Sequence, residues 1–229
     1  MKISIITLFP KMISGFFEES IIKRAQEKKL VEVEIINLRD FAIDDYGTVD
    51  DRPYGGGAGM VIRVDVVHKA LQKVKNVGKN LKVILTSPKG KQFNQKKAQE
   101  YSKSDNLIII AGHYEGVDER VTEFIDEEVS VGDFILTGGE LPAAMITDSV
   151  VRLIPGVLKK EEATINETFN IQGKKLLEYP QYTRPEEFHG LKVPKILTGG
   201  NHKEIEKWKS EKAVEETKKK RSDLIDTKK

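Results

Sequence analysis

The 229-residue sequence contains no cysteine, and its four histidines are scattered. Without cysteine, the chain has no disulfides, no thiol nucleophile and no thiolate-bound zinc. None of the histidines has the spacing of a metal-binding pair, so no metal-ligating residue is predicted. The G-x-S-x-G, H-E-x-x-H and G-x-x-x-x-G-K-[ST] patterns are also missing. Hydrolase, metalloprotease and nucleotide-hydrolysing functions therefore have no support in the sequence.

Long apolar runs are missing as well, because no stretch approaches the roughly 20 residues that a helix needs to cross a bilayer. The opening MKISIITLFP is briefly apolar, but no small-residue cleavage site follows it, which favours a first strand over a signal peptide. We expect a cytoplasmic protein that does not enter a membrane. The formal net charge is only +2, although lysine-rich runs gather in the last third of the chain. Such runs fit either solvated faces or RNA contacts.

Apolar strand patterns alternate with helical patterns over the first two thirds of the chain. Strands are predicted at 2–9, 31–38, 81–86, 107–111 and 128–136. Helices are predicted at 65–74, 89–103 and 117–124, from Glu140 onward, and around inward-facing Phe17, Ile21 and Ala25. This alternation predicts an α/β fold with a mostly parallel sheet.

The composition becomes polar after Pro155. We therefore predict an α/β domain at 1–155, an interdomain linker at 156–175 and a small α-helical domain at 176–229. The linker is expected to order only when substrate binds, and the last domain to contain a helix from about Lys203. That domain has few candidate core residues, so we expect it to depend on a partner surface.

Three of the expected strands end in glycine or proline breaks: LTSPKG at 85–90, AGHYEGVDERV at 111–121 and VGDFILTGGELPAAM at 131–145. The carboxyl ends of parallel strands share one edge of a sheet, so these breaks predict one ligand site there. Gly138 and Gly139 lie where a strand end becomes a helix start. A glycine pair there lets a ligand approach the backbone, although it also fits an ordinary strand-to-helix turn.

A glycine-rich loop, RPYGGGAGM at 52–60, follows the second expected strand. Its spacing matches neither the dinucleotide fingerprint nor the phosphate-binding loop. Beside Arg52 and Tyr54, such a loop either admits a flat base close to the backbone or is simply a mobile surface loop.

These segments resemble the bacterial tRNA (guanine-37-N1)-methyltransferase family. The resemblance also includes LFP at 8–10, DDRPYGGGAGM at 50–60, VRLIPGVL at 151–158, YPQYTRP at 179–185 and TGGNH at 198–202, in the family's order. It implies a deep trefoil knot in the α/β domain, with S-adenosylmethionine bound inside the knot. It further implies use of Mg²⁺, a tRNA substrate methylated on N1 of guanosine 37, and a homodimer whose active site is shared between subunits.

The resemblance assigns catalysis to two residues that would otherwise be taken for surface charges. Glu167 in NETF stands where the family has aspartate, and it is the expected base that removes the N1 proton. Arg152 is expected to donate to guanine O6, where negative charge grows.

The resemblance also implies two binding sets. The cofactor is expected to contact Leu85, Thr86, Ser87, Gly112, Glu115, Val131, Gly132, Asp133, Phe134, Ile135, Leu136, Gly138, Gly139 and Pro142. The tRNA is expected to contact Asp50, Arg52, Tyr54, Gly55, Gly56, Gly57, Gly59, Arg184 and His202.

An acidic group at Glu115, Asp118 and Glu119 has three interpretations: binding Mg²⁺, ordering the methionine amino group of the cofactor, or beginning a helix. Two other functions fit the same motifs. One is a related knotted methyltransferase acting on ribosomal RNA or on ribose 2′-OH. The other is an RNA-binding protein that has lost catalysis. The observation behind this alternative is that position 167 has glutamate where the family has aspartate.

Overall fold

The computed structural model describes residues 1–74, 80–159, 164, 166–171 and 173–225. Contacts within the chain divide it into two compact units, Met1–Lys159 and Lys160–Lys229. We call them unit 1 and unit 2 and describe each by itself. Part of the predicted linker, at 160–163, 165 and 172, lies outside the described residues.

Unit 1 is built on a five-stranded sheet in which every pair of neighbouring strands is parallel. From edge to edge its strands are β2 (Glu32–Asn37), β1 (Lys2–Thr7), β6 (Asn106–Ala111), β5 (Leu81–Gln92) and β7 (Glu127–Ser130). The predicted α/β class with a parallel sheet is confirmed. The central strands are almost fully buried, as expected for a parallel sheet covered on both faces.

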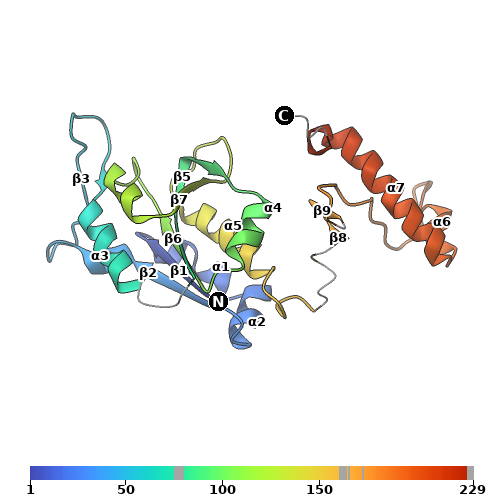
Figure 1. Ribbon diagram of the computed structural model, residues 1–229, viewed down its shortest axis with the longest axis horizontal. Coiled ribbons are helices and arrows are strands. Elements are labelled where there is room, and N and C mark those ends of the chain that lie inside the picture. Colours follow the sequence, from blue (N-terminus) through green and yellow to red (C-terminus); the bar gives the residue numbers. More distant parts are fainter. Residues whose placement is uncertain (75–79, 160–163, 165, 172, 226–229) are drawn as a thin grey trace. The chain divides into compact units, whose positions relative to one another are not determined.

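Helices cover both faces of this sheet (Figure 1). They are α1 (Ser14–Phe17), α2 (Ser20–Glu27), α3 (Val64–Val74), α4 (Gln95–Tyr101) and α5 (Glu140–Val151), with 3₁₀ turns η1 (Pro10–Met12), η2 (Leu38–Phe41) and η3 (Glu119–Phe124). Neighbouring Ile5 and Ile6 of β1 belong to two different hydrophobic cores, because successive strand side chains point to opposite faces. The core with Ile5 includes residues of α1, α2, α4 and α5, and the core with Ile6 includes α3.

Most predicted helices are present, with corrected details. The helix after β1 is broken into α1 and α2, and Ile22 is fully packed in place of the predicted Ile21. Of the segment predicted as a helix at 117–124, residues Glu119–Phe124 form the 3₁₀ turn η3. In α5 the apolar stripe starts as predicted, since Ile146 and Val150 are completely buried.

Two predicted boundaries in the sheet are wrong. The strand expected at 81–86 continues to Gln92, so residues 89–92 are strand, and α4 begins only at Gln95. A register shift between Thr86 and Lys91 lets β5 pair with β7 again beyond the bend. The strand expected at 128–136 ends at Ser130, and 131–136 form a loop.

The glycine-rich loop is held at its base by a small hairpin, β3 (Asp50–Asp51) and β4 (Val61–Ile62), which was not predicted within the expected loop. Figure 1 shows the loop projecting beyond β3. Gly55, Gly56, Gly57 and Gly59 all have positive φ, a conformation that glycine adopts without strain.

Unit 2 contains one long helix and several short elements. These are β8 (Asn166–Glu167), β9 (Asn170–Ile171), β10 (Glu187–Phe188), β11 (Leu191–Lys192), α6 (Lys195–Thr198), α7 (His202–Lys220) and η5 (Ser222–Leu224). The helix predicted from about Lys203 is thus confirmed. Its core is small, since only Ala213, Thr217 and Leu224 are buried among the described residues of this unit. Within the described parts of both units, no helix has the length and apolar character needed to span a membrane.

Candidate active site

A cavity of about 310 Å³ opens in unit 1 at the carboxyl ends of β6 and β7, beside the register shift of β5. It is lined by residues of three segments, 85–89 within β5 at its register shift, 112–117 after β6 and 128–139 at and after β7, together with Glu119, Thr122 and Pro142. A cavity therefore lies where the ligand site was predicted, at the carboxyl edge of the sheet. The three glycine and proline breaks surround one space because parallel strands bring their ends to the same edge.

The glycine pair of the third segment packs against Thr86 of β5 and against the end of β6. The Gly139 N–H donates to the Gly112 carbonyl at 2.6 Å. A Cβ on Gly139 would overlap Thr86 Oγ1 and lie 2.9 Å from the Gly112 nitrogen and 3.0 Å from the Ala111 Cα. Real Cβ atoms do not approach other atoms so closely, so this position requires glycine. The pair is thus a close-packed junction rather than an ordinary exposed turn.

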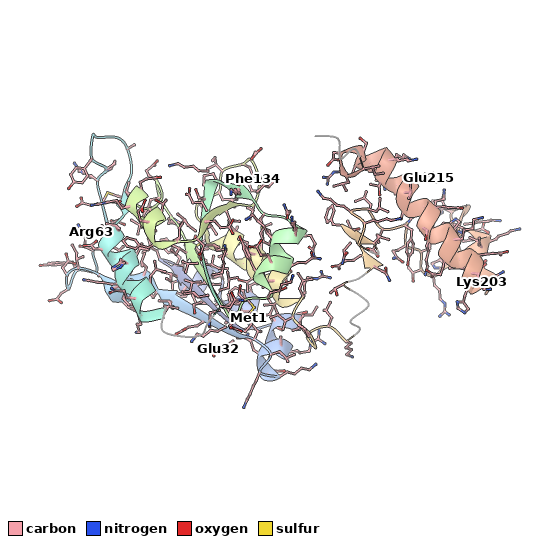
Figure 2. All side chains as sticks on the ribbon, viewed as in Figure 1. Met1, Glu32, Arg63, Phe134, Lys203 and Glu215 are labelled. Atoms are coloured by element: carbon pink, nitrogen blue, oxygen red, sulfur yellow. The ribbon has the colours of Figure 1, made fainter. Side chains whose placement is uncertain are left out.

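Apolar side chains of the loop after β7 stand open to solvent beside the cavity. Phe134 is 54% exposed, Ile135 83% and Leu136 37%. Figure 2 shows Phe134 on this loop, at the end of unit 1 where β5 and β7 finish. Exposed apolar groups around a concave site are typical of binding surfaces for flat or apolar ligands.

The cavity gathers nearly all of the residues predicted to contact the cofactor. Those that line it are Leu85, Thr86, Ser87, Gly112, Glu115, Val131, Gly132, Phe134, Ile135, Leu136, Gly138, Gly139 and Pro142. Asp133 is not among the lining residues. Glu115, Glu119 and Glu128 are also among the lining residues, together with one lysine, Lys89, so acidic residues outnumber basic ones there.

The glycine-rich loop is tied to the second of these segments. The Glu115 N–H donates to the Met60 carbonyl at 3.1 Å, and the Ile62 N–H donates to the Gly116 carbonyl at 3.0 Å. A Cβ on Gly59 would lie 2.7 Å from Glu115 Oε1, so the loop backbone passes directly beside a cavity-lining carboxylate. Asp50 and Arg52, also predicted to contact tRNA, flank the base of the loop, and Tyr54 is fully exposed.

The three acids of the expected acidic group have separate environments. Asp118 begins η3 by accepting the Arg120 N–H, and its carboxylate pairs with the Arg120 guanidinium at 2.7 Å. Those hydrogen bonds hold the pKa of Asp118 below its usual value. Glu119 is exposed and lies 3.8 Å from Lys89, whereas Glu115 faces the glycine-rich loop. The helix-starting interpretation is therefore confirmed for Asp118. Across the described residues, no group of three or more histidine, cysteine or acidic side chains is arranged to hold a metal.

A buried polar network beneath the cavity was not predicted as functional. Glu140, at the start of α5, is completely buried, and its carboxylate accepts from Thr7 Oγ1 at 2.8 Å and lies 3.3 Å from His113 Nδ1. His113 also lines the cavity and packs its ring 4.5 Å from that of Phe9. A first-turn acid is ordinarily exposed. No local pattern separates Glu140 from such acids, because its partners come from residues far away in the sequence.

The two expected catalytic residues lie in different units. Arg152 caps the C-terminal end of α5 and is partly buried. Glu167 is partly buried in β8, opposite Asn170 of β9, so it belongs to a short hairpin rather than to extended linker. Arg184 and His202 are exposed in unit 2, and His202 is the first residue of α7.

A family profile described as "tRNA (Guanine-1)-methyltransferase TrmD" matches residues 1–227. The chain belongs to this family. It is 54% identical over 224 residues to the tRNA (guanine-N(1)-)-methyltransferase of Clostridium botulinum strain Eklund 17B, covering 98% of this chain and 92% of that protein. The enzymes of the same name from Dictyoglomus turgidum and Bacillus pumilus are 50% and 48% identical, each over 99% of this chain and 90% and 93% of their own lengths.

The tRNA (guanine-1)-methyltransferase match spans both units, so it includes the cavity of unit 1 and the hairpin that contains Glu167. The family resemblance inferred from the motifs is thereby confirmed.

Proposed function

We propose that the protein methylates N1 of guanosine 37 in tRNA, with S-adenosylmethionine as methyl donor. The observation that carries the proposal is the family match over residues 1–227, supported by relatives of similar length named for methylation of guanine N1 in tRNA. The chain is accordingly an enzyme, a tRNA (guanine-N1)-methyltransferase. Position 37 and the residue roles below rest on the motif resemblance.

The cavity in unit 1 suits S-adenosylmethionine in shape and charge. Phe134, Ile135 and Leu136 offer apolar area to an adenine ring, and the glycines between the strand ends leave backbone groups accessible. Both the sulfonium and the amino group of the cofactor are positive, and Glu115, Glu119 and Glu128 are among the residues that line the space. When bound, the cofactor supplies a methyl group on a sulfonium centre.

Two side chains carry the proton chemistry in this proposal. Methyl transfer to N1 of guanine would form a new nitrogen–carbon bond as the methyl–sulfur bond of the sulfonium donor breaks, leaving the sulfur as a neutral thioether, and N1 must lose its proton. The Glu167 carboxylate takes that proton as general base. Negative charge then grows on guanine O6, and the Arg152 guanidinium stabilises it by donating a hydrogen bond. Tyr54 stacks on a base extruded from the tRNA, with the glycine-rich loop close to it.

The backbone around Gly139 supports a trefoil knot in unit 1, which is part of the proposal. After β7, which is the edge strand, the chain returns to β5 and β6, which neighbour each other in the sheet. There Gly139 contacts Thr86, within β5 at its register shift, and Gly112 after β6. It then leaves the site as α5, which packs on the sheet face that contains Ile5. A knot requires the chain to pass through a loop formed by another segment, and the close approach of Gly139 to both strands is what such a passage would produce.

The remaining parts of the proposal follow the resemblance. The enzyme is a homodimer with an active site shared between subunits, residues 156–175 link an α/β domain to a helical tRNA-binding domain, and Mg²⁺ assists the reaction. Lys218, Lys219 and Lys220 in the last turn of α7 support an RNA-contacting role for unit 2, because a run of exposed lysines attracts phosphates.

Methyl transfer to two unmodified tRNA transcripts tests the proposal directly. One transcript has G after the anticodon and the other has A. We expect labelled methyl groups from S-adenosylmethionine to appear only on the G-bearing transcript, and nuclease mapping to place them on N1. Transfer to both transcripts, or to ribose 2′-OH, would favour a related knotted methyltransferase. Cofactor binding without transfer would favour an RNA-binding protein.

A further inference from the structure

The Thr7–Phe9–His113–Glu140 network closes into a ring beneath the cavity. The Phe9 N–H donates to Thr7 Oγ1 at 2.9 Å, and Thr7 Oγ1 donates to Glu140 Oε1 at 2.8 Å. Glu140 Oε2 lies 3.3 Å from His113 Nδ1, and the His113 ring packs against Phe9. Four residues from three distant segments, 7–9, 113 and 140, therefore hold one another in place.

The direction of the His113 contact follows from chemistry. A carboxylate only accepts hydrogen bonds, so His113 must have its hydrogen on Nδ1 to bond with Glu140. Both carboxylate oxygens of Glu140 then have a donor, as a completely buried acid requires. The bond fixes which ring nitrogen has the hydrogen and how the ring is turned.

The network joins two of the segments that line the cavity. His113 lies in the segment after β6, and Glu140 directly follows the glycine pair of the segment after β7. The backbones of His113 and Gly138 also form an antiparallel bridge. Thr7 anchors both to β1, a central strand of the sheet with no exposed residue at this end. Breaking these hydrogen bonds would therefore loosen the second and third cavity segments while their glycine backbone stays chemically unchanged.

We propose that Thr7, Glu140 and His113 are positioning residues that hold the second and third cavity segments in the conformation that binds S-adenosylmethionine. The inference rests on the proposed function, because it assigns the cavity to that cofactor. A pre-formed wall lowers the cost of ordering on binding, so its loss weakens the affinity for the cofactor. At saturating cofactor the wall is ordered again, and the turnover number recovers.

His113 offers a matched pair of substitutions. In His113→Asn the amide nitrogen occupies nearly the place of Nδ1, two bonds from Cβ, and keeps a donor for Glu140. In His113→Gln the same amide lies one methylene further out. His113→Leu removes the donor but keeps similar bulk. We expect the dissociation constant for S-adenosylmethionine, measured by calorimetry, to rise about tenfold in His113→Leu and His113→Gln and to stay within about threefold of wild type in His113→Asn.

Thr7 separates positioning from direct contact, since Thr7 is completely buried and does not line the cavity. Thr7→Val removes the donor to Glu140 and keeps the shape, whereas Thr7→Ser retains the hydroxyl. We expect Thr7→Val to raise the KM for S-adenosylmethionine about tenfold with kcat within about twofold of wild type. Thr7→Ser is expected to restore the wild-type KM. Circular dichroism confirms that each variant is folded.

Several outcomes would overturn the inference. One is that Thr7→Val and His113→Leu both bind the cofactor as tightly as wild type. If His113→Leu does not fold, His113→Gln takes its place in this comparison. Another is equal loss of affinity in His113→Asn and His113→Gln. A third is a fall in kcat at unchanged KM, which would place these residues in the chemical step. If the wild-type protein itself does not bind S-adenosylmethionine, the proposed cofactor site fails instead.

Discussion

At the scale of single residues, Glu167 is the clearest test of the proposed chemistry. We expect Glu167→Ala to lower the single-turnover rate of methyl transfer about 10²- to 10⁴-fold, because N1 then has no base. The matched variant Glu167→Gln keeps the shape but cannot accept a proton, so it is expected to lose as much. Both variants should bind S-adenosylmethionine as tightly as wild type. An unaffected rate in either variant would remove Glu167 from the mechanism.

Gly139 is a second test at this scale. A Cβ there would overlap Thr86 Oγ1 and crowd Gly112, so we expect Gly139→Ala to lower the free energy of unfolding by about 1–3 kcal/mol. The matched control is Gly15→Ala in α1, where a Cβ meets nothing within 4 Å. There the free energy of unfolding should be unchanged or rise by up to about 1 kcal/mol. Urea denaturation measures both. Equal effects of the two substitutions would contradict the close packing at the strand ends.

At the scale of elements, we expect a substitution in the glycine-rich loop to weaken tRNA binding without changing the binding of S-adenosylmethionine. Tyr54 is fully exposed on this loop, available to stack on a base. We expect Tyr54→Ala to raise the KM for tRNA about tenfold and to leave the dissociation constant for S-adenosylmethionine unchanged. Tyr54→Phe keeps the ring and should behave as wild type in both measurements. Loss of activity in Tyr54→Phe would show that the hydroxyl, and not stacking, is required.

The start of β7 depends on a partly buried carboxylate, that of Glu127. Glu127 bonds to Lys97, to Tyr101 Oη at 2.9 Å and to Lys82 at 3.2 Å. Burial raises the pKa of Glu127, but the hydrogen bonds from these three groups outweigh it and bring the pKa below its usual value of 4.5. A carboxyl with a lowered folded-state pKa stabilises the fold above pH 4.5, and this stabilisation is lost as the pH falls through the folded-state value.

Glu127→Gln tests this pH dependence. At pH 7 the variant should have a free energy of unfolding about 1–3 kcal/mol below wild type, because the charged bonds are gone. The difference should narrow as the pH falls below 4.5. Exposed Glu119, 3.8 Å from Lys89, provides the control, and Glu119→Gln should change the free energy of unfolding by less than about 1 kcal/mol. Urea denaturation at several pH values would refute the idea if the Glu127→Gln difference stayed constant.

The elements also show how far sequence alone predicts this structure. Buried strands such as β1 and β6 were predicted because their apolar runs are local signals. The extension of β5 to Gln92 was not, because its residues are polar and the pairing is set by β7, where Gly90 lies against the Glu128 and Val129 backbone. The loop at 131–136 was mistaken for strand because Phe134, Ile135 and Leu136 are apolar. These apolar side chains line a cavity and are exposed, whereas those of a buried strand would pack in the core.

The site shows the same division. Glycine and proline breaks located the cavity, because the ends of parallel strands share one edge. The ring of Thr7, Phe9, His113 and Glu140 was missed, since its hydrogen bonds join residues up to 133 positions apart. Pattern reading has no signal for such pairs. The roles of Glu167 and Arg152 came only from the family resemblance, because isolated charges have no distinguishing local pattern.

At the scale of the whole molecule, the proposed homodimer with a shared active site predicts that two inactive variants regain activity when their subunits are mixed. Arg152→Ala and Glu167→Ala each remove one catalytic group from a different unit of the chain. In a mixed dimer, one subunit keeps Arg152 and the other keeps Glu167. If the two groups of one site come from different subunits, one site of each mixed dimer is complete and the other lacks both groups.

Random exchange of subunits makes about half of the dimers mixed, and each mixed dimer has one working site out of two. We therefore expect the mixture to show about one quarter of the wild-type rate of methyl transfer. Each variant exchanged with itself is the control and should stay inactive. Affinity tags of two kinds on the variants confirm that mixed dimers have formed. If tagged mixed dimers form and remain inactive, both groups of a site belong to the same subunit and the shared site is wrong. If no mixed species forms and the wild-type protein sediments as a monomer, the homodimer itself is wrong.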